Sequence, residues 1–174
     1  MNKTEAQNLT NSLINKTFLV HGKTLCARDL GYSFEWMSNR VKMTLGQCSY
    51  DAKKIRLSPT YVENNGVTLV EDTIRHELSH AFSYHIFGRK GWGHNYYWKS
   101  VCVQVGAYPQ RCKSEKDGLV VSDHKYVLRN KETLEIHGKY HRNPKKLISQ
   151  CRAGTVWIRG KKNETKGKLE VVPV

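Results

Sequence analysis

The sequence lacks long apolar runs and paired cysteines. No run of about 18 or more apolar residues occurs, and the first residues are polar, so neither a membrane-spanning helix nor a signal peptide is predicted. We therefore expect a soluble intracellular protein, cytoplasmic (nucleoid-associated) or nuclear and not secreted, without a membrane partner. The five cysteines form no C-x-x-C pair, which favours reduced, mostly buried and inert thiols over a disulfide framework.

Acidic residues are also scarce, with 15 Asp and Glu against 29 Lys and Arg and a formal net charge of +14. Such an excess favours a polyanionic partner, nucleic acid above all, although it says nothing about the fold. The excess is uneven along the chain. From Arg111 to Val174 there are sixteen basic and seven acidic residues, against thirteen and eight in the first 110. We therefore divide the chain into residues 1–110 and 111–174.

The sequence does contain one motif that suggests a chemical function, H-E-L-S-H at residues 76–80. On a helix, His76 and His80 project from one face and can bind a single metal ion, while Glu77 beside them can take a proton from water at that metal. The spacing predicts a helix over about residues 69–87, beginning at a Thr68–Glu71 capping box and ending at Gly88. Its opposite side carries an apolar stripe of Ile74, Leu78, Ala81, Phe82 and Ile86.

A catalytic zinc needs a third protein ligand. A glutamate further along the chain is excluded, because no acidic residue lies between Glu77 and Glu115. His85 lies about 180° around the helix from His76 and is interpreted as a structural histidine on the packed side. His94 follows a loop with three glycines that lets the chain turn back, and helical spacing from Asn95 to Val105 would hold it in a first turn. We therefore predict His94 as the third ligand.

The remaining pattern of residues 1–110 predicts an α+β fold. A helix is expected over residues 4–19, and alternation of apolar and polar residues predicts three short strands over residues 32–37, 41–45 and 55–57. Together they predict helices packed on a small antiparallel sheet. A substrate peptide can pair with an edge strand of such a sheet, but the sequence does not identify that strand.

The motifs H-E-L-S-H-A and, fourteen residues later, G-H-x-x-x-W resemble the SprT-like family of small zinc metalloproteases, which includes the Spartan proteases. The upstream segments 40–48 and 55–59 resemble the hairpin that precedes the active-site helix in that family. The resemblance covers residues 5–110 and implies a minimal zincin-type protease domain. It also implies the substrate class, namely proteins on DNA, including crosslinked ones, with DNA acting to recruit or switch on the protease.

The predicted activity is zinc-dependent endopeptidase cleavage, with one catalytic Zn²⁺ held by His76, His80 and His94. Zinc acts as a Lewis acid and acidifies water, and Glu77 serves as the general base that passes the proton to the leaving amine. The oxyanion needs a further donor, for which Tyr96 or Tyr97 is a candidate by its place in the sequence. The alternative for this tyrosine pair is simple packing at the start of a helix.

The C-terminal region departs from the family. Many SprT-like proteins end in a four-cysteine zinc ribbon that begins much like His124-Lys125-Tyr126, but here only Cys151 remains of any plausible set. The region is therefore expected to be basic and β-rich, with strand-like segments at residues 125–128 and 155–158. It is either a degenerate zinc-ribbon-like subdomain that folds without metal or not that ribbon. A replacement site is conceivable from Cys112, His124, His137, His141 and Cys151, although no spacing favours it.

Basic residues interleaved with aromatic ones suit single-stranded or junction-like DNA, because phosphates attract the charge and bases stack on rings. The candidate contacts are Lys145, Lys146, Trp157, Lys161 and Lys162. The alternative is a solvated basic face with a few core aromatics. Two other functions stay open for the monomer that we expect: a DNA-binding module whose zincin domain is structural, and a regulatory protease that cuts one specific protein partner.

Overall fold

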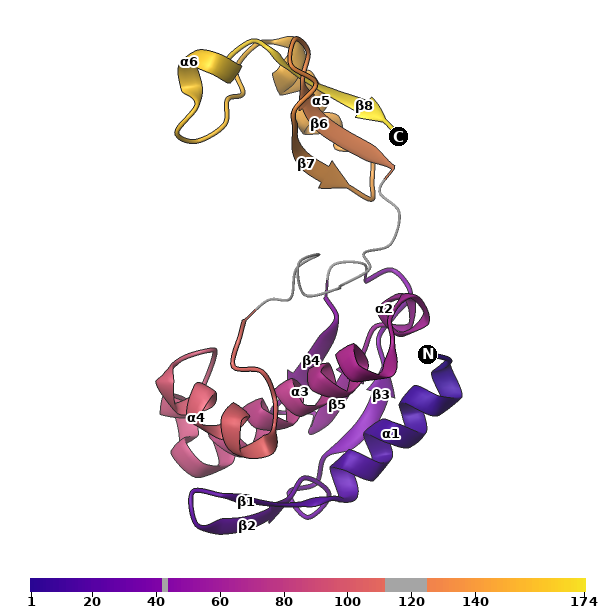
Figure 1. The fold of residues 1–174 in the computed structure, drawn as a ribbon, viewed down its shortest axis with the longest axis vertical. Coiled ribbons are helices and arrows are strands. Elements are labelled where there is room, and N and C mark those ends of the chain that lie inside the picture. Colours follow the sequence, from indigo (N-terminus) through magenta and orange to yellow (C-terminus); the bar gives the residue numbers. More distant parts are fainter. Residues whose placement is uncertain (42–43, 112–124) are drawn as a thin grey trace. The chain divides into compact units, whose positions relative to one another are not determined.

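A computed structural model describes residues 1–41, 44–111 and 125–174 (Figure 1). The chain divides into two compact units, Met1–Ser122 and Asp123–Val174, which are described separately below. The sequence-based boundary at residue 110 remains a prediction. Across the described residues, no helix combines the length and the apolar character needed to cross a membrane.

The first unit begins with a helix and a hairpin, and it differs here from the sequence-based expectation. Helix α1 (Lys3–Asn15) starts with a capping box in which Asn2 and Glu5 bond to each other's backbone N–H groups. It ends four residues earlier than the predicted residue 19, because β1 (Thr17–Val20) pairs with β2 (Lys23–Cys26). Positive φ angles at His21 and Gly22 fit the two-residue turn that joins such strands, so residues 17–20 are a strand.

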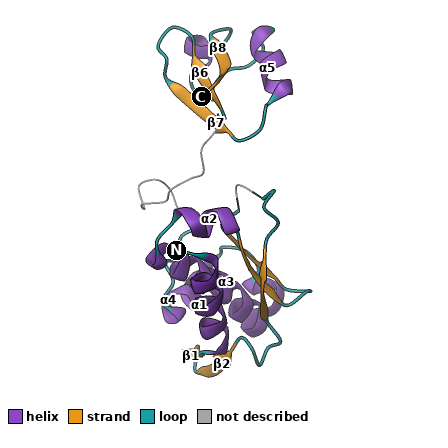
Figure 2. Cartoon of the chain, turned by 90° about the vertical axis from the view of Figure 1, so that its right-hand side faces the viewer, coloured by secondary structure: helices purple, strands orange, loops and turns teal. Residues whose placement is uncertain are grey.

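A three-stranded sheet of order β3-β5-β4 lies beside the long helix of this unit. Its strands are β3 (Ser33–Trp36), β4 (Gly46–Ser49) and β5 (Lys54–Leu57). The α+β class is confirmed, but the sheet is mixed rather than antiparallel, because β3 and β5 run parallel while β4 and β5 run antiparallel. Figure 2 shows these strands against the helices.

The strand predicted over residues 41–45 is misplaced. Residues 42–43 lie outside the described residues, and the neighbouring positions 41, 44 and 45 are not in a strand. The strand begins instead at Gly46, a residue that normally weakens strands and that a sequence pattern places at a strand end. Glycine fits there because a Cβ atom at position 46 would lie 2.9 Å from both a carboxylate oxygen of Glu77 and the methyl carbon of Thr73, so a side chain would displace these groups.

The long helix α3 (Val67–Phe87) follows a short helix α2 (Pro59–Asn64) and carries the H-E-L-S-H motif. Its predicted end at Gly88 is confirmed, whereas its start lies at the N-cap Gly66 and not at a Thr68–Glu71 capping box. The Glu71 side chain instead accepts two hydrogen bonds from Arg75, one turn further on. The predicted stripe faces the core, with Ile74, Leu78, Ala81 and Phe82 fully buried and Ile86 partly buried.

A short 3-10 helix η1 (Gly88–Gly91) and helix α4 (Tyr96–Val105) complete the described part of the first unit. The predicted helix over residues 95–105 is confirmed, with the Asn95 side chain accepting a hydrogen bond from the Trp98 backbone N–H. His94 therefore lies immediately before the N-cap and not inside the first turn. Gly91 packs so closely on α3 that a Cβ atom there would lie 2.2 Å from the Ser83 carbonyl oxygen.

The second unit contains an antiparallel sheet of order β7-β6-β8 with two helices. Its elements are β6 (Tyr126–Asn130), β7 (Ile136–Tyr140), α5 (Lys145–Arg152), α6 (Lys162–Thr165) and β8 (Leu169–Pro173). The small core consists of Leu128, Cys151 and Leu169. The predicted strand near residue 126 is confirmed, whereas residues 155–158 form none, since the Ile158 N–H donates to the Thr165 hydroxyl rather than to a neighbouring strand.

Four of the five cysteines lie in the described part of the chain, and all four are free thiols. Cys102 and Cys151 are buried, while Cys26 and Cys48 are half-buried. Burial raises the pKa of Cys48 and of Cys102 to about 12, so both thiols stay protonated near neutral pH. The interpretation as inert thiols agrees with this arrangement; Cys112 lies outside the described residues.

Candidate metal centre

The structure brings the three predicted histidine ligands together. His76 and His80 lie one turn apart on α3, and His94 approaches them from the loop before α4. The Nε2 atom of His94 lies 3.1 Å from Nε2 of His76 and 3.2 Å from Nε2 of His80. Within the described residues, these three form the one group of His, Cys, Asp or Glu side chains arranged to hold a metal ion.

The surroundings favour the neutral, ligating form of these imidazoles. Burial, and then the charges of His76 and His94, lower the pKa of His80 to about 3. Burial, and then the charge of Arg111, also lower the pKa of His94. Because a metal binds the neutral imidazole nitrogen, little proton release is needed at neutral pH before His80 and His94 can bind one.

The donor set fits a metal ion in its spacing and its chemistry. When two histidine nitrogens bind one tetrahedral ion with bonds of about 2.0–2.1 Å, the two nitrogen atoms lie about 3.3 Å apart. The two Nε2 separations of 3.1 and 3.2 Å are close to that value. Three imidazoles suit zinc, copper, iron or nickel rather than magnesium or calcium. Three protein ligands also leave a coordination position for water or substrate, which is the arrangement of a catalytic site.

Trp98 packs against all three histidines from α4. Its side chain is fully buried, and its ring centroid lies 4.6–5.1 Å from those of His76, His80 and His94. The ring is nearly parallel to His80, with an angle of 23° between the planes. This tryptophan is the last residue of the G-H-x-x-x-W motif, and its ring contacts all three ligand rings.

Glu77 lies beside the triad and is buried between α3 and β4, with 6% of its surface exposed. Burial raises the pKa of its carboxyl group to about 8, although a hydrogen bond from the Cys48 backbone N–H favours the charged form. Gly46 makes this position possible, because any side chain there would meet the carboxylate. The site therefore combines a metal-binding triad with a carboxyl group whose proton affinity lies near neutral pH.

Tyr50 is a site residue that the sequence pattern did not identify. It follows β4 directly, and its hydroxyl oxygen lies 3.4 Å from Nδ1 of His80. If Nε2 of His80 binds a metal, Nδ1 carries the proton and donates a hydrogen bond to the Tyr50 hydroxyl oxygen. This bond fixes the tautomer and the orientation of the ring. Tyr50 lies 30 residues before His80, and only the strand pairing of β4 brings the two together. No sequence periodicity signals this contact.

We expect Tyr50→Phe to weaken metal binding by about 10-fold, the lower end of what the loss of a ligand's hydrogen-bond partner costs. The change removes the hydroxyl group and keeps the ring. Competition with a chromophoric chelator would measure the dissociation constant. Tyr84→Phe is the matched control, because it removes an equivalent hydroxyl group from the ring that packs against Tyr50, and Tyr84 has no described contact with a ligand ring. Equal metal affinity of the Tyr50 variant and the parent would contradict the positioning role.

Other predicted residues of the first unit lie elsewhere. Tyr96 is 79% exposed, and Tyr97 packs on Phe87 with ring centroids 4.8 Å apart. The described contacts place neither ring against the triad, so an oxyanion role for either stays a prediction. His85 is exposed and not on a packed side, because the last turn of α3 extends beyond the core, where Ile86 and Phe87 are only partly buried.

The predicted nucleic-acid residues of the second unit form two groups. Lys145 and Lys146 are exposed in the first turn of α5. Trp157 is 46% exposed, and Nζ of Lys162 lies 5.0 Å from its ring centroid. Lys161 forms an ion pair with Glu135 at 3.0 Å. Of the conceivable replacement metal site, Cys112 and His124 lie outside the described residues, and the described members form no metal-binding group.

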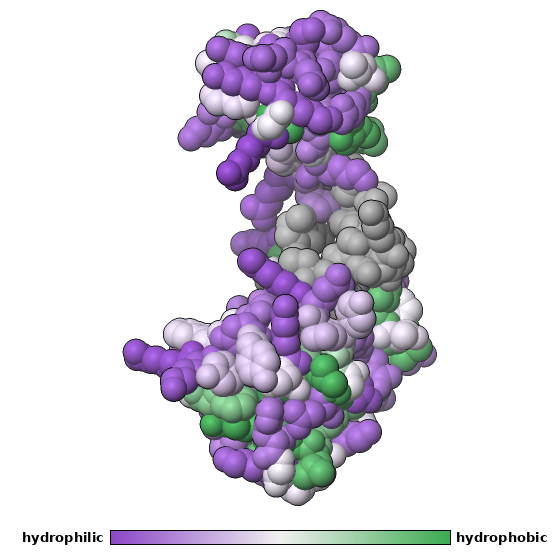
Figure 3. Space-filling model, turned by 60° about the vertical axis from the view of Figure 1, so that its left-hand side comes forward, coloured by the Kyte–Doolittle hydropathy of each residue, from purple (hydrophilic) through white to green (hydrophobic). Residues whose placement is uncertain are grey.

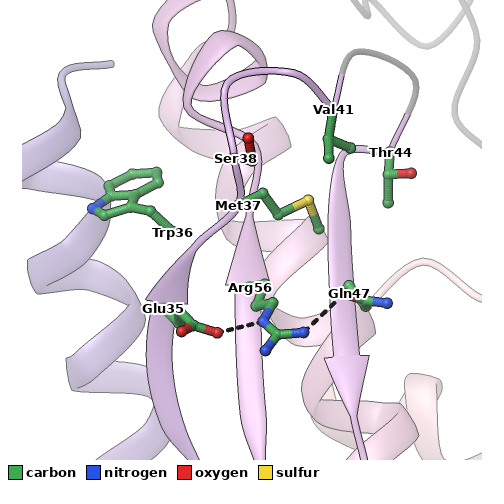
Figure 4. Close-up of a pocket in the computed structure, with 8 residues that line it drawn as sticks. All are labelled: Glu35, Trp36, Met37, Ser38, Val41, Thr44, Gln47 and Arg56. Atoms are coloured by element: carbon green, nitrogen blue, oxygen red, sulfur yellow. Dashed lines mark hydrogen bonds and ion pairs between the residues drawn. The ribbon is translucent and has the colours of Figure 1, made fainter.

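A separate pocket of about 420 Å³ lies on the face of the mixed sheet that is turned away from Glu77 and α3 (Figure 4). Side chains alternate along a strand, so Gln47 points away from the face on which Gly46 and Cys48 meet Glu77. In this pocket Arg56 donates hydrogen bonds to Glu35 and Gln47 across the three strands. The carboxylate of Glu35 thus balances the charge of Arg56. The two hydrogen bonds of Arg56 join β5 to β3 and to β4, the strand beside Glu77.

The model of the SprT-like family matches residues 11–117, which include the mixed sheet, the histidine triad and Glu77. No solved structure matches the chain.

Proposed function

Since the chain belongs to the SprT-like family, which consists of zincin-like metalloprotease domains, we propose that it is a zinc-dependent endopeptidase acting on DNA-associated or DNA-crosslinked proteins. The observation that carries the proposal is the burial of Glu77 beside three histidine nitrogens that converge on one point. A purely structural metal site needs no such carboxyl group. Zinc is the ion proposed, because a three-histidine set with an open position is typical of catalytic zinc.

In this proposal each residue has a separate task. A bound zinc ion supplies Lewis-acid chemistry by polarising a carbonyl group and acidifying water. His76, His80 and His94 hold the ion, and Trp98 and Tyr50 orient their rings. The Glu77 carboxylate accepts the proton of the attacking water and donates it to the leaving amine nitrogen. Burial raises the pKa of this carboxyl group, and the role requires it first to take up and then to release a proton.

The outer edge of β4 is the proposed place for the peptide. β4 is an edge strand, and Leu45, which precedes it, accepts a hydrogen bond from Ser58. Because antiparallel pairs alternate between bonded and non-bonded positions, Gly46 and Cys48 then direct their backbone groups away from β5. The Cys48 N–H reaches Glu77. The remaining outward groups can pair with an extended peptide, which places its backbone beside the catalytic carboxyl group.

Two features of the second unit support DNA as the partner. Residues Asp123–Val174 carry a net charge of +8, from thirteen basic and five acidic residues. Its exposed Trp157 lies beside Lys162, so a base can stack on the ring while the ammonium group meets a phosphate. In the view of Figure 3 the surface of this unit is mostly hydrophilic.

The proposal is tested by cleavage of an unfolded protein substrate by the zinc-loaded full-length chain, with and without single-stranded DNA. We expect cleavage that is inhibited by chelators and increased by DNA. Cleavage without any response to DNA would favour the alternative of a regulatory protease with its own protein partner. DNA binding without any cleavage would favour a DNA-binding module. Either result would overturn the proposal in its present form.

For DNA binding, we expect reversal of charge at Lys145, Lys146, Lys161 and Lys162 to lower both the affinity and its dependence on salt. Each lost phosphate contact should reduce the slope of log K against log salt concentration by about 0.7–0.9. Fluorescence anisotropy of labelled single-stranded DNA would measure both quantities. An unchanged slope would exclude these lysines from the interface.

Trp157→Ala distinguishes stacking from packing within the same assay. Because Trp157 is 46% exposed, its truncation should cost about 1–3 kcal/mol of single-strand affinity and little stability. Leu134→Ala provides a control, since Leu134 is an equally accessible apolar side chain of this unit, 58% exposed, that is not a predicted contact. A loss of unfolding free energy with unchanged affinity would mean that Trp157 is a packing residue.

A further inference from the structure

Three aromatic side chains from three elements meet close to the metal centre. Tyr84 follows His80 by four residues and therefore lies on the same face of α3 as the two ligands. Tyr50 follows β4, and Trp92 lies between η1 and His94. The ring centroids of Tyr50 and Tyr84 are 4.6 Å apart, those of Tyr50 and Trp92 are 5.9 Å apart, and those of Tyr84 and Trp92 are 6.5 Å apart. We call Tyr50, Tyr84 and Trp92 the aromatic shelf.

The shelf is held in place and yet open to solvent. Trp92 is 58% exposed, although it is the largest apolar residue of its loop. The backbone on both sides of Trp92 is fixed, because Gly91 packs on the Ser83 carbonyl and the Asn95 side chain donates hydrogen bonds to the carbonyls of Lys90 and Trp92. A rigid, exposed indole loses little conformational entropy when it binds, which favours a role in recognition.

The shelf is continuous with the proposed catalytic surface. The Tyr50 hydroxyl group lies 3.4 Å from Nδ1 of His80, so the shelf adjoins a metal ligand. Tyr50 is also the residue that follows Ser49, the last residue of the edge strand β4. A peptide that pairs with the outer edge of β4 beside Glu77 therefore extends toward the shelf. The three shelf side chains are aromatic and include no carboxylate, ammonium or guanidinium group, which favours an apolar group as their partner.

We propose that the aromatic shelf is a subsite for one aromatic or large aliphatic side chain of the substrate, close to the bond that is cut. The inference rests on the proposed protease function and specifies its substrate. Phe, Tyr and Leu side chains of folded proteins are mostly buried. A subsite of this kind therefore selects unfolded segments, in which such side chains are accessible and the backbone is free to pair with β4.

Binding tests this subsite without relying on catalysis. The full-length Glu77→Gln variant, loaded with zinc, is titrated into labelled peptides of Gly, Ser and Ala that carry a single Phe at successive positions. We expect one position of Phe to increase affinity by about 10-fold over the all-small peptide, the effect of burying one aromatic side chain. Trp92→Ala in the same background should abolish that increase. Leu19→Ala, which truncates a 68% exposed side chain on β1, should preserve it.

The outcomes separate the subsite from the protease proposal. Equal affinity for all peptides, no detectable binding, or a Phe preference that survives Trp92→Ala would overturn the subsite. Cleavage of the same peptides by the parent protein is measured in parallel. Cleavage without a Phe preference in binding would uphold the protease and reject the shelf. A Phe preference that depends on Trp92, without any cleavage, would uphold the shelf and reject the protease.

Discussion

Glu77→Gln should lower peptide hydrolysis by about 10²–10⁴-fold, the usual contribution of a general base, while the metal stays bound. Glutamine has the size of glutamate but cannot accept a proton. The substitution also fits the site, because a neutral amide replaces the carboxyl group of a residue that is only 6% exposed, and burial disfavours the charged form of that group. The measurements are kcat/KM on an unfolded substrate and metal content by mass spectrometry.

Glu63→Gln is the control for this prediction. Glu63 belongs to the same unit, but its side chain is 53% exposed and, among the described residues, forms a surface ion pair with Lys3. Such pairs contribute about 0–1 kcal/mol, so activity should be unchanged. Hydrolysis by the Glu77 variant at the rate of the parent would show that another group accepts the proton. Loss of the metal would show instead that Glu77 helps to hold the triad in place.

Trp98→Ala should destabilise the first unit by about 3–5 kcal/mol, the range for truncating a fully buried aromatic residue. The effect is a large fraction of the total stability of a typical domain, which is about 5–15 kcal/mol. Metal affinity should fall as well, because the three ligand rings lose the surface against which they pack. Denaturant unfolding followed by circular dichroism gives the free energy of unfolding.

Two further tryptophan variants make this prediction specific. Trp92→Ala, six residues earlier but 58% exposed, should change stability by no more than about 0.5 kcal/mol. Trp98→Phe should lose less than Trp98→Ala, because it keeps an aromatic ring and removes an indole N–H that has no hydrogen-bond partner among the described residues. If Trp98→Ala unfolded at the same denaturant concentration as the parent, the packing of Trp98 against the three histidines would not stabilise the first unit.

The sequence predicts the triad and Glu77 because these residues depend on helical spacing and on one short loop. His76, Glu77 and His80 are neighbours on one helix, and His94 follows fourteen residues after His80. Tyr50 could not be predicted, because its contact with His80 depends on how β4 lies beside α3. The start of β4 was missed for a related reason: Gly46 is selected by the space that Glu77 occupies and not by strand preference.

Local patterns also failed where tertiary contacts decide the structure. Phe18 continues the apolar spacing of α1, yet it belongs to β1, because the turn at residues 21–22 allows a hairpin. Residues 155–158 alternate like a strand, but their backbone bonds go to Gln150 and Thr165. In the second unit, Cys151 packs in an apolar core with Leu128 and Leu169. In the described part of this unit, Cys151 is thus a residue of the apolar core, whereas in a four-cysteine ribbon it would be a zinc ligand.

The close packing of Gly91 on α3 has a consequence for how the centre acquires and loses its ion. The Ser83 hydroxyl group donates a hydrogen bond to the Gly91 carbonyl at 3.0 Å, so contacts with α3 help to hold the loop that carries His94. The loop loses its conformational entropy when the protein folds, so metal binding does not have to order it. We therefore expect the first unit to keep its fold when the ion is removed, in contrast to zinc fingers, whose chains unfold without their metal.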